Sequence, residues 1–171
     1  MIIRDELIEW LDYDPETGVF TWRKDVRSGI YGNGRAVRAG QVAGSQDAGG
    51  YRVIRVCGHV CKAHRLAWLY VYGVWPDMWL DHINNDRQDN RIANLRQATE
   101  AGNAHNASVR KDNVSGFKGV TWHKASQRWV AQIGNGRGKR KHLGCYKTPE
   151  EAHAAYADAA VKHFGKFART S

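Results

Sequence analysis

Cysteine and proline are both scarce in this chain of 171 residues, which contains three of each. A small, odd set of cysteines does not make a disulfide framework and suits a reducing compartment. Cys57 and Cys61 resemble half of a zinc site, but no second ligand pair stands at zinc-finger spacing. We therefore expect no structural zinc, and we interpret residues 57–61 as the tip of a hairpin.

A long hydrophobic run is also missing. Crossing a bilayer takes about 20 consecutive apolar residues, and no stretch of this sequence approaches that length. The N-terminal sequence MIIRDELIEW carries acidic residues where a secretory signal would be apolar. These absences predict a soluble, cytoplasmic protein without membrane contact.

Acidic residues are few in the last third of the chain. Residues 107–171 contain 13 Lys and Arg but only four Asp and Glu, whereas residues 1–106 contain 13 of each kind, so the whole net charge of +9 lies in the C-terminal part. An excess of this size favours a polyanionic partner. In residues 1–106 the acids gather in 5–16 and 77–100, which separates a metal-binding region from a mostly basic stretch, 23–65, that suits phosphate.

Local patterns in the first part predict a mixture of helices and short strands. Residues 27–50 are rich in glycine and arginine, and we expect a loop there with one short strand near 41–43. The other expected elements are a short helix starting near Asp5, a turn over 13–18, a strand over 19–22, a hairpin over 51–63 and a helix over 65–72. A short helix and an extended piece should follow within 86–99 and lead to another helix near 100–106.

A polar segment, residues 107–113, is the predicted linker to a second domain, 114–171. Three strands, at 117–123, 128–133 and 139–146, should form an antiparallel meander. A helix follows, because Thr148 can cap its N-terminus, Pro149 fits its first position and Glu151 completes a capping box. The fold class is therefore α+β, with the second domain a small three-stranded sheet packed on one helix.

Residues 64–106 hold the side chains that suit phosphodiester hydrolysis, which needs an activated water and neutralisation of charge on the phosphate. His82 can accept the proton of the water, and Asp81 can bind a hard divalent cation. If the pair ends a strand, the two side chains point to opposite faces, so Asp81 can bind metal without His82. Asn103 offers a second oxygen ligand, and Asn94 can hold the loop or the other nitrogen of the histidine.

A structural interpretation of the same residues competes with the catalytic one. His82 alone could be a satisfied core histidine, and asparagine commonly caps turns. The spacing of the whole set favours the site. His64 and Arg65 fit either backbone fixing or substrate contact, and Asn84 and Asn90 are expected to be structural.

The spaced set in this region consists of Asp81-His82-Ile83-Asn84, Asp89-Asn90-Arg91-Ile92, Asn94-Leu95-Arg96, and Asn103 with Asn106; upstream it extends to His64-Arg65-Leu66-Ala67-Trp68 and, loosely, to Tyr13-Asp14-Pro15 with Gly18. It resembles the HNH endonucleases of the phage and intron-encoded homing type.

The resemblance implies a nuclease domain over residues 1–106, with core motif 64–106 and a ββα-metal fold. It further implies Asp81 and Asn103 as metal ligands, His82 as general base and Asn94 as the middle residue of the motif. Asn103 stands where the last letter of the family name denotes histidine, which favours Mg²⁺ or Mn²⁺.

The second domain carries another dense pattern, made of Gly116-Phe117-Lys118-Gly119-Val120, Trp129-Val130-Ala131, Leu143-Gly144, Thr148 to Ala152, Ala155-Tyr156 and Ala159-Ala160. It resembles the APETALA2-type DNA-binding domain of plant ethylene-response factors. The resemblance implies a three-stranded sheet in the major groove with a helix behind it. The plant domains have other residues at Thr121, Gly134 and His142, so their target sequence is not transferred.

DNA contacts are expected from the strands and turns of this sheet. Lys and Arg suit phosphate, whereas Gln132 suits adenine and Arg128 guanine. Alternation in the middle strand places these two and Val130 on one face, opposite Trp129, Ala131 and Ile133. The alternative is a merely solvated basic face, with Trp129 partly in the core. The expected set is Trp122, His123, Lys124, Arg128, Gln132, Arg137, Lys139, Arg140 and His142.

Both resemblances together predict a metal-dependent, site-preferring DNA endonuclease of the homing type, which hydrolyses phosphodiester bonds of double-stranded DNA with a single metal ion. The alternative is a non-catalytic, sequence-specific DNA-binding protein or transcription regulator. One metal site attacks one strand at a time, so the protein is either a monomer or a homodimer that cuts both strands. A phage-encoded enzyme would work in the cytoplasm of the host cell.

Overall fold

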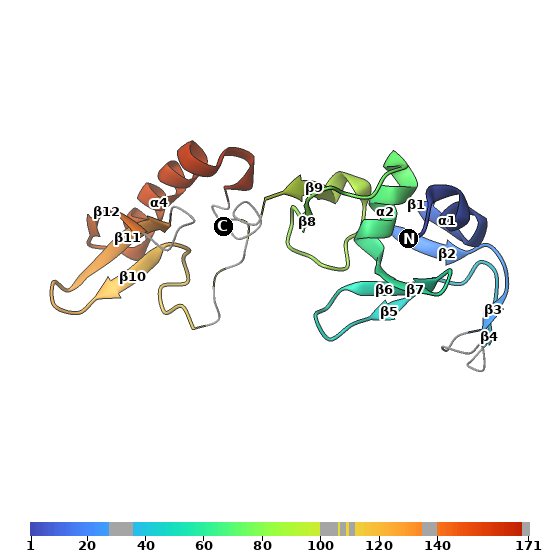
Figure 1. Ribbon diagram of the computed structural model, residues 1–171. Helices are drawn as coiled ribbons and strands as arrows, with labels where there is room; N and C mark the ends of the chain where they lie inside the picture. The colour runs from blue at the N-terminus through green and yellow to red at the C-terminus, as the bar shows by residue number, and fades with distance from the viewer. Residues whose placement is uncertain (28–35, 100–105, 107–108, 110–111, 135–139, 169–171) are drawn as a thin grey trace. The chain divides into compact units, whose positions relative to one another are not determined.

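The computed structural model describes residues 1–27, 36–99, 106, 109, 112–134 and 140–168. The chain divides into two compact units, Met1–Ala98 and Thr99–Ser171, and each is described by itself. The predicted first domain, 1–106, extends past this division. Both units combine helices with small antiparallel sheets (Figure 1). Among the predicted site residues, Asn103, Arg137 and Lys139 lie outside the described residues.

The first unit begins with helix α1 (Arg4–Trp10), which leads directly into the hairpin of β1 (Leu11–Asp14) and β2 (Val19–Trp22). Two short strands, β3 (Val26–Arg27) and β4 (Ala36–Val37), pair next. The strand expected near 41–43 does not form, because Val42 makes only an isolated bridge to Thr21. The next strand along the chain is β5 (Ser45–Gln46).

A three-stranded sheet with the order β5-β6-β7 supports the middle of the unit. The predicted hairpin is confirmed as β6 (Arg52–Val56) and β7 (His59–Lys62). Its turn residues, Cys57 and Gly58, have φ of 49° and 75°, as two-residue hairpin turns require. Helix α2 (Ala63–Tyr72) follows and packs against β6 and β7, and Gly73 ends it in the left-handed conformation.

The last elements of the unit are β8 (Trp79–His82), the 3₁₀ helix η1 (Ile92–Asn94) and β9 (Leu95–Ala98). Strands β8 and β9 form an antiparallel pair. A ββα arrangement requires a helix after β9, and of the range 100–106 expected to form it only Asn106 is described. Beneath these elements lies one core, formed by α1, β1, β2, β6 and α2, with fully buried members Leu7, Leu11, Phe20, Ile54 and Leu66.

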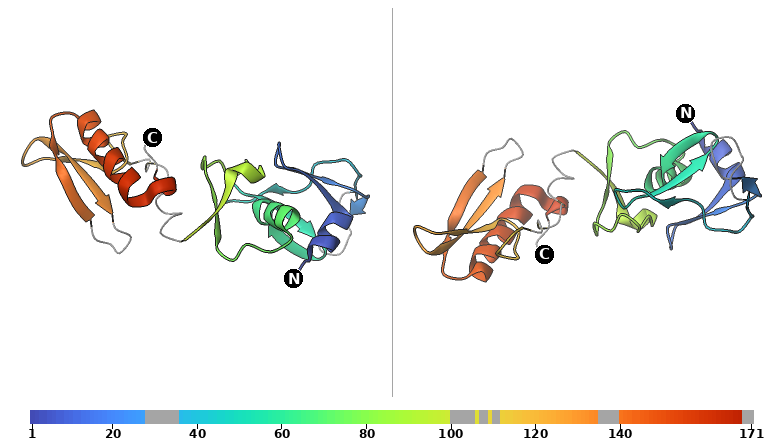
Figure 2. Two further views of the ribbon diagram at one scale, coloured as in Figure 1. Left: turned by 90° about the horizontal axis from the view of Figure 1, so that it is seen from above. Right: turned by 90° about the horizontal axis from the view of Figure 1, so that it is seen from below.

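The second unit is a meander of β10 (Val120–His123), β11 (Arg128–Gly134) and β12 (Arg140–Tyr146), followed by α4 (Pro149–Phe164) and the 3₁₀ helix η2 (Gly165–Phe167). Thr148 Oγ1 accepts from the Glu151 N–H at 3.2 Å, so the predicted capping box is confirmed. Figure 2 shows α4 lying across one face of the sheet. Alanines on the helix permit this close packing, since Ala152 and Ala160 are fully buried.

None of the helices in the described parts of the two units has the length and apolar character that a membrane crossing demands.

Candidate active site

Asp81 and His82 are the last two residues of β8, and both are buried, with exposed fractions of 4% and 5%. Strand pairing places Asp81 opposite Arg96 and His82 opposite Leu95 on β9. Consecutive residues of a strand point to opposite faces, so the carboxylate and the imidazole lie on different sides of the hairpin. The site thus separates a candidate metal ligand from a candidate base.

The Asp81 carboxylate is held by Arg96 from the paired strand. Nε and Nη2 of Arg96 donate to Asp81 Oδ2 at 2.9 and 2.7 Å. The exposed fractions of the two side chains are 5% for Asp81 and 14% for Arg96, so the guanidinium fixes a buried carboxylate and balances its charge. An oriented carboxylate oxygen is the hard ligand that Mg²⁺ and Mn²⁺ prefer.

A metal site built only from protein acids, histidines and cysteines is absent from the described residues, which contain no cluster of three or more such groups. Asn103, the predicted second ligand, is outside the described residues.

Asn90 contacts one ring nitrogen of His82. His82 Nε2 lies 3.3 Å from Asn90 Oδ1. The Asn90 amide is itself oriented, because its Nδ2 donates to the Gln88 carbonyl at 3.0 Å. An oxygen facing Nε2 accepts a proton from it, so the neutral ring has its lone pair on Nδ1. The expectation that Asn90 is structural missed this contact with the candidate base.

Burial lowers the pKa of His82 below its ordinary value of 6.5, although the Asn90 hydrogen bond and the Asp81 charge oppose this effect. Burial lowers this pKa because the positively charged imidazolium is poorly solvated inside the protein. His82 is therefore neutral at pH 7 and can accept a proton.

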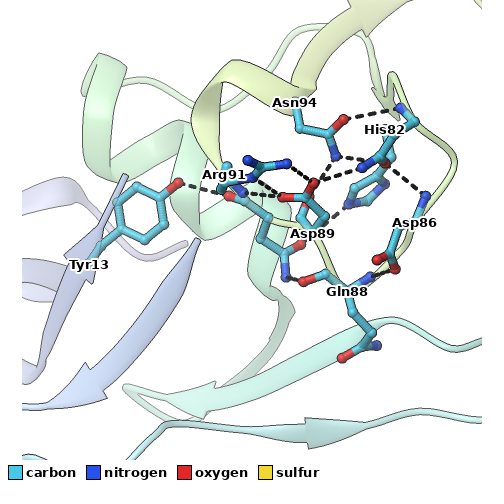
Figure 3. Close-up of polar contacts among 9 residues, drawn as sticks. Tyr13, His82, Asp86, Gln88, Asp89, Arg91 and Asn94 are labelled. Atoms are coloured by element: carbon cyan, nitrogen blue, oxygen red, sulfur yellow. Dashed lines mark hydrogen bonds and ion pairs between the residues drawn. The ribbon is translucent and has the colours of Figure 1, made fainter. Parts of the chain in front are cut away.

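Asn94 holds the loop between β8 and η1. Its Oδ1 accepts from the Asn84 N–H at 3.1 Å, and its Nδ2 donates to Asn84 Oδ1 at 3.0 Å and to the Asp89 carbonyl at 2.8 Å. Figure 3 shows the Asn94 side chain close to Asp89 and His82. Of the two positions considered for Asn94, these bonds favour the loop over the histidine.

Asp89 and Arg91 brace the same loop. Arg91 Nε and Nη2 donate to the two Asp89 oxygens at 2.7 and 2.6 Å, and Asn84 Nδ2 donates to Asp89 at 2.7 Å. The hydrogen bonds from Arg91 are the main reason why the pKa of Asp89 falls to about 2. The Asp-Asn-Arg block thus combines an ion pair with the amide that orients His82.

The β1–β2 hairpin packs against the Asp89-Asn90-Arg91 segment. These contacts explain why the sequence pattern extends upstream to Tyr13 and Gly18. Tyr13 Oη donates to the Asn90 carbonyl at 2.8 Å (Figure 3). Gly18 has φ of 73°, and a Cβ there would meet the Arg91 nitrogen and lie 2.5 Å from the Asn90 carbonyl carbon. Only glycine leaves room for this approach.

We expect Gly18→Ala to lower the free energy of unfolding by about 1 to 3 kcal/mol more than Gly58→Ala does, because overpacking adds to backbone strain. Gly58 is the matched control: its φ is 75°, and a Cβ there meets nothing within 4 Å. Urea unfolding of both variants measures the difference. Equal losses would show that Gly18 does not pack against the Asn90 segment.

An aromatic cluster lies behind His82. The His64 ring is 4.9 Å from the His82 ring at 83°, and Tyr51 is 5.4 Å from His64 and 6.0 Å from His82. Burial lowers the pKa of His64 to about 3, so its ring is neutral packing for the base. Of the two roles considered for His64, these contacts support the structural one. No local signal pointed to Tyr51, because its partners are distant in sequence.

In the second unit the faces of β11 divide as expected. Ala131 and Ile133 are buried against α4, with Trp129 packed beside them. Arg128 and Gln132 are on the opposite face, where strand pairing sets His123 beside Arg128 and His142 beside Gln132.

The other described residues that were predicted to contact DNA lie in three different places. Arg140 ends the row on the open face, opposite Gly134, and Lys124 lies in the exposed turn between β10 and β11. Trp122 does not share that face, because it pairs with Trp129, with the ring centres 5.0 Å apart.

Two known families match separate parts of the chain. Residues 61–105 match the sequence model of the HNH endonuclease family, and residues 115–165 match that of the AP2 domain. The first match contains the β8–β9 hairpin with its loop, and the second contains the meander and the whole of α4. The order of the two is the one that the sequence patterns indicated.

Relatives of two kinds share sequence with this chain. Protein 3.8 of Escherichia phage T7 is 27% identical over 107 residues, which cover 56% of this chain and 88% of the phage protein. The AP2-like ethylene-responsive transcription factor AIL7 of Arabidopsis thaliana is 36% identical over 87 residues, or 50% of this chain and 16% of the plant protein. The ethylene-responsive transcription factor WRI1 of the same plant is 46% identical over 59 residues, 34% of this chain and 14% of that factor.

Proposed function

Because the chain joins an HNH endonuclease segment to an AP2 domain, we propose that it is a metal-dependent, site-preferring DNA endonuclease of the homing type. The first unit cuts, and the second unit binds the target duplex. The observation that carries the proposal is the pair of buried side chains that ends β8: the His82 imidazole, with Nε2 3.3 Å from Asn90 Oδ1, next to the Asp81 carboxylate that Arg96 holds.

In this proposal His82 Nδ1 accepts the proton of the attacking water, and Asn90 keeps the ring aligned through Nε2. Asp81, with Asn103, would hold a Mg²⁺ or Mn²⁺ ion, which when bound supplies positive charge for the phosphate and the leaving 3′ oxygen. Asn94 and the Asp89–Arg91 pair keep the loop in shape while the base works.

The second unit presents Arg128, Gln132 and Arg140 on the face of the sheet away from α4. A sheet of this width fits the major groove, where Gln132 could pair with adenine and Arg128 with guanine. The plant relatives named above support DNA binding by this unit, and both are named as transcription factors. That observation favours, as a second candidate, a regulator that binds DNA without cutting it.

Cleavage of supercoiled plasmid by the full-length chain separates the two candidates. We expect nicked or linear DNA with Mg²⁺ or Mn²⁺ and intact DNA with EDTA, because the phosphate charge then lacks its counter-charge. Zn²⁺ should support little cleavage, given the oxygen donors. A chain that binds the plasmid but leaves it intact with both Mg²⁺ and Mn²⁺ would be the regulator.

The number of strands cut reports on the working form. One site per chain attacks one strand, so a monomer gives mainly nicked circles and a homodimer gives linear DNA at early times. The same plasmid assay, followed over time at several protein concentrations, distinguishes them.

A further inference from the structure

Two cations lie on one aromatic ring beside His82, and the proposed mechanism does not use them. Lys62 Nζ is 3.8 Å from the centre of the Tyr51 ring, and Arg87 Cζ is 4.8 Å from it. The same ring is 6.0 Å from the ring of His82. Lys62 ends β7, Tyr51 precedes β6 and Arg87 belongs to the β8–η1 loop, so three segments meet here.

The position of this group is fixed by backbone contacts. Tyr51 exchanges two hydrogen bonds with Asp47: its N–H donates to Oδ1 at 2.9 Å, and its carbonyl accepts from the Asp47 N–H at 2.8 Å. Arg87 Nη1 donates to the Gly49 carbonyl at 2.6 Å, and Gln88 Nε2 donates to the Gly50 carbonyl. These bonds connect the β8–η1 loop to the turn that carries Tyr51.

The charges of these two cations are not neutralised within the described residues, where neither forms an ion pair with a carboxylate. The contrast is with Arg23, Lys24, Arg91 and Arg96, each of which has an acidic partner within 3.4 Å. A ring face attracts a cation without cancelling its charge. Arg87 is also exposed and Lys62 half-buried, so both can reach an anion from solvent.

We propose that Lys62 and Arg87, held on Tyr51, form a clamp for one backbone phosphate of the DNA strand, next to the bond that the water activated by His82 would attack. This inference rests on the proposed function, since the anion is taken to be the DNA substrate. The clamp explains why an ordered pair of cations borders the base. It adds to the first unit a grip on the strand that is separate from the basic second unit.

The first test is the salt dependence of DNA binding by the full-length chain in EDTA, where no cutting occurs. Lys62→Ala/Arg87→Ala should reduce the slope of log affinity against log salt by about 0.9, the value for one phosphate contact on duplex DNA. The matched control is Arg23→Ala/Lys24→Ala, which removes the same charge. Lys24 also lies over a ring, 3.8 Å from that of Trp10, but Glu9 pairs with it. Equal slopes for the two double variants would overturn the clamp.

The second test uses cleavage. We expect kcat/KM to fall about 10- to 100-fold in Lys62→Ala/Arg87→Ala, the loss typical of a charge-assisted contact. A neutral methylphosphonate is then placed at each phosphate position near the cut in turn. At one position it should slow cleavage by the wild type, and at that position it should not slow this variant any further. Equal sensitivity of both proteins at every position would contradict the assignment.

Folding and function are separated by two further readouts. Lys62→Arg/Arg87→Lys retains both charges and should keep the wild-type salt slope, and urea unfolding reports whether either double variant is folded. A charge-retaining variant that is folded yet loses the slope would also contradict the clamp. If the wild type binds DNA but never cuts it, the nuclease proposal fails, and the salt slopes alone still decide on the clamp.

Discussion

His82→Ala is expected to reduce the rate of DNA cleavage by about 10²- to 10⁴-fold, the usual contribution of a general base. The imidazole is buried and its Nε2 lies 3.3 Å from Asn90 Oδ1, so the alanine variant loses an oriented base. DNA affinity measured in EDTA should be unchanged, because phosphate contacts come from cations elsewhere. Single-turnover cleavage of a labelled duplex gives the rate, and gel shift gives the affinity.

The matched control is His59→Ala, which removes an exposed histidine of β7 outside the site. It should cleave at the wild-type rate. A His82→Ala protein that is folded, by urea unfolding, and still cleaves within tenfold of wild type would remove His82 from the role of base.

The pH profile of the wild type provides a second view of the same group. A base works only when it is unprotonated, so cleavage is lost as pH falls through its pKa. Burial lowers the pKa of His82 below 6.5, so the midpoint of the acid limb should lie below pH 6.5, and more than half of the maximal rate should persist at that pH. An acid limb centred above 6.5 would indicate a different titrating group.

The sequence alone was enough to group Asp81, His82 and Asn94, because their pattern is local. Asp81, His82 and Asn94 lie on one hairpin with its loop, and the β8–β9 pairing keeps residues that are near in sequence near in space. The capping box at Thr148 and the turn at Gly58 were equally accessible, since each depends on neighbours within four residues.

What could not be predicted depends on contacts between distant segments. Tyr13 donates to the Asn90 carbonyl although the two residues are 77 positions apart in the sequence. Nothing local in the sequence indicates that Asn90 is the partner of His82. Asp81 meets Arg96 only in the observed register of β8 and β9. A shift of one residue between the two strands would remove this ion pair. Tyr51 and Arg87 meet only because the loop closes on the β5–β6 turn.

The faces of the second unit show a similar limit. Alternation along β11 correctly separated Arg128 and Gln132 from the core, because a strand has a period of two. Grouping Trp122 with them failed to account for the register of β10, which sets this tryptophan opposite Trp129. Whether Trp122 contacts DNA from that position remains a prediction, as do the contacts of Arg137 and Lys139.

Removing residues 107–171 is expected to weaken binding to the target duplex by about 10³-fold or more, the usual gap between specific and non-specific binding. The deleted part holds 13 Lys and Arg, against four acids, and the face that carries Arg128, Gln132 and Arg140. The target is first obtained by selecting cleaved duplexes from a randomised library. Affinity is then measured over a range of salt concentrations.

The salt slope distinguishes a DNA-reading sheet from a merely solvated one. If Arg128, Arg140 and Lys124 each bind a phosphate, the slope should fall by about 0.9 for each of these cations, and hence by nearly three on truncation. In the full-length chain, Arg128→Ala should lower it by about 0.9 or weaken discrimination at one base pair, while Lys162→Ala should do neither. Lys162 is the fair comparison because it is an exposed cation on α4, the element behind the sheet. An unchanged slope after truncation would mean that the charge excess of the second unit is not what holds the DNA, and the grip would then have to come from the first unit, where Lys62 and Arg87 lie beside the base.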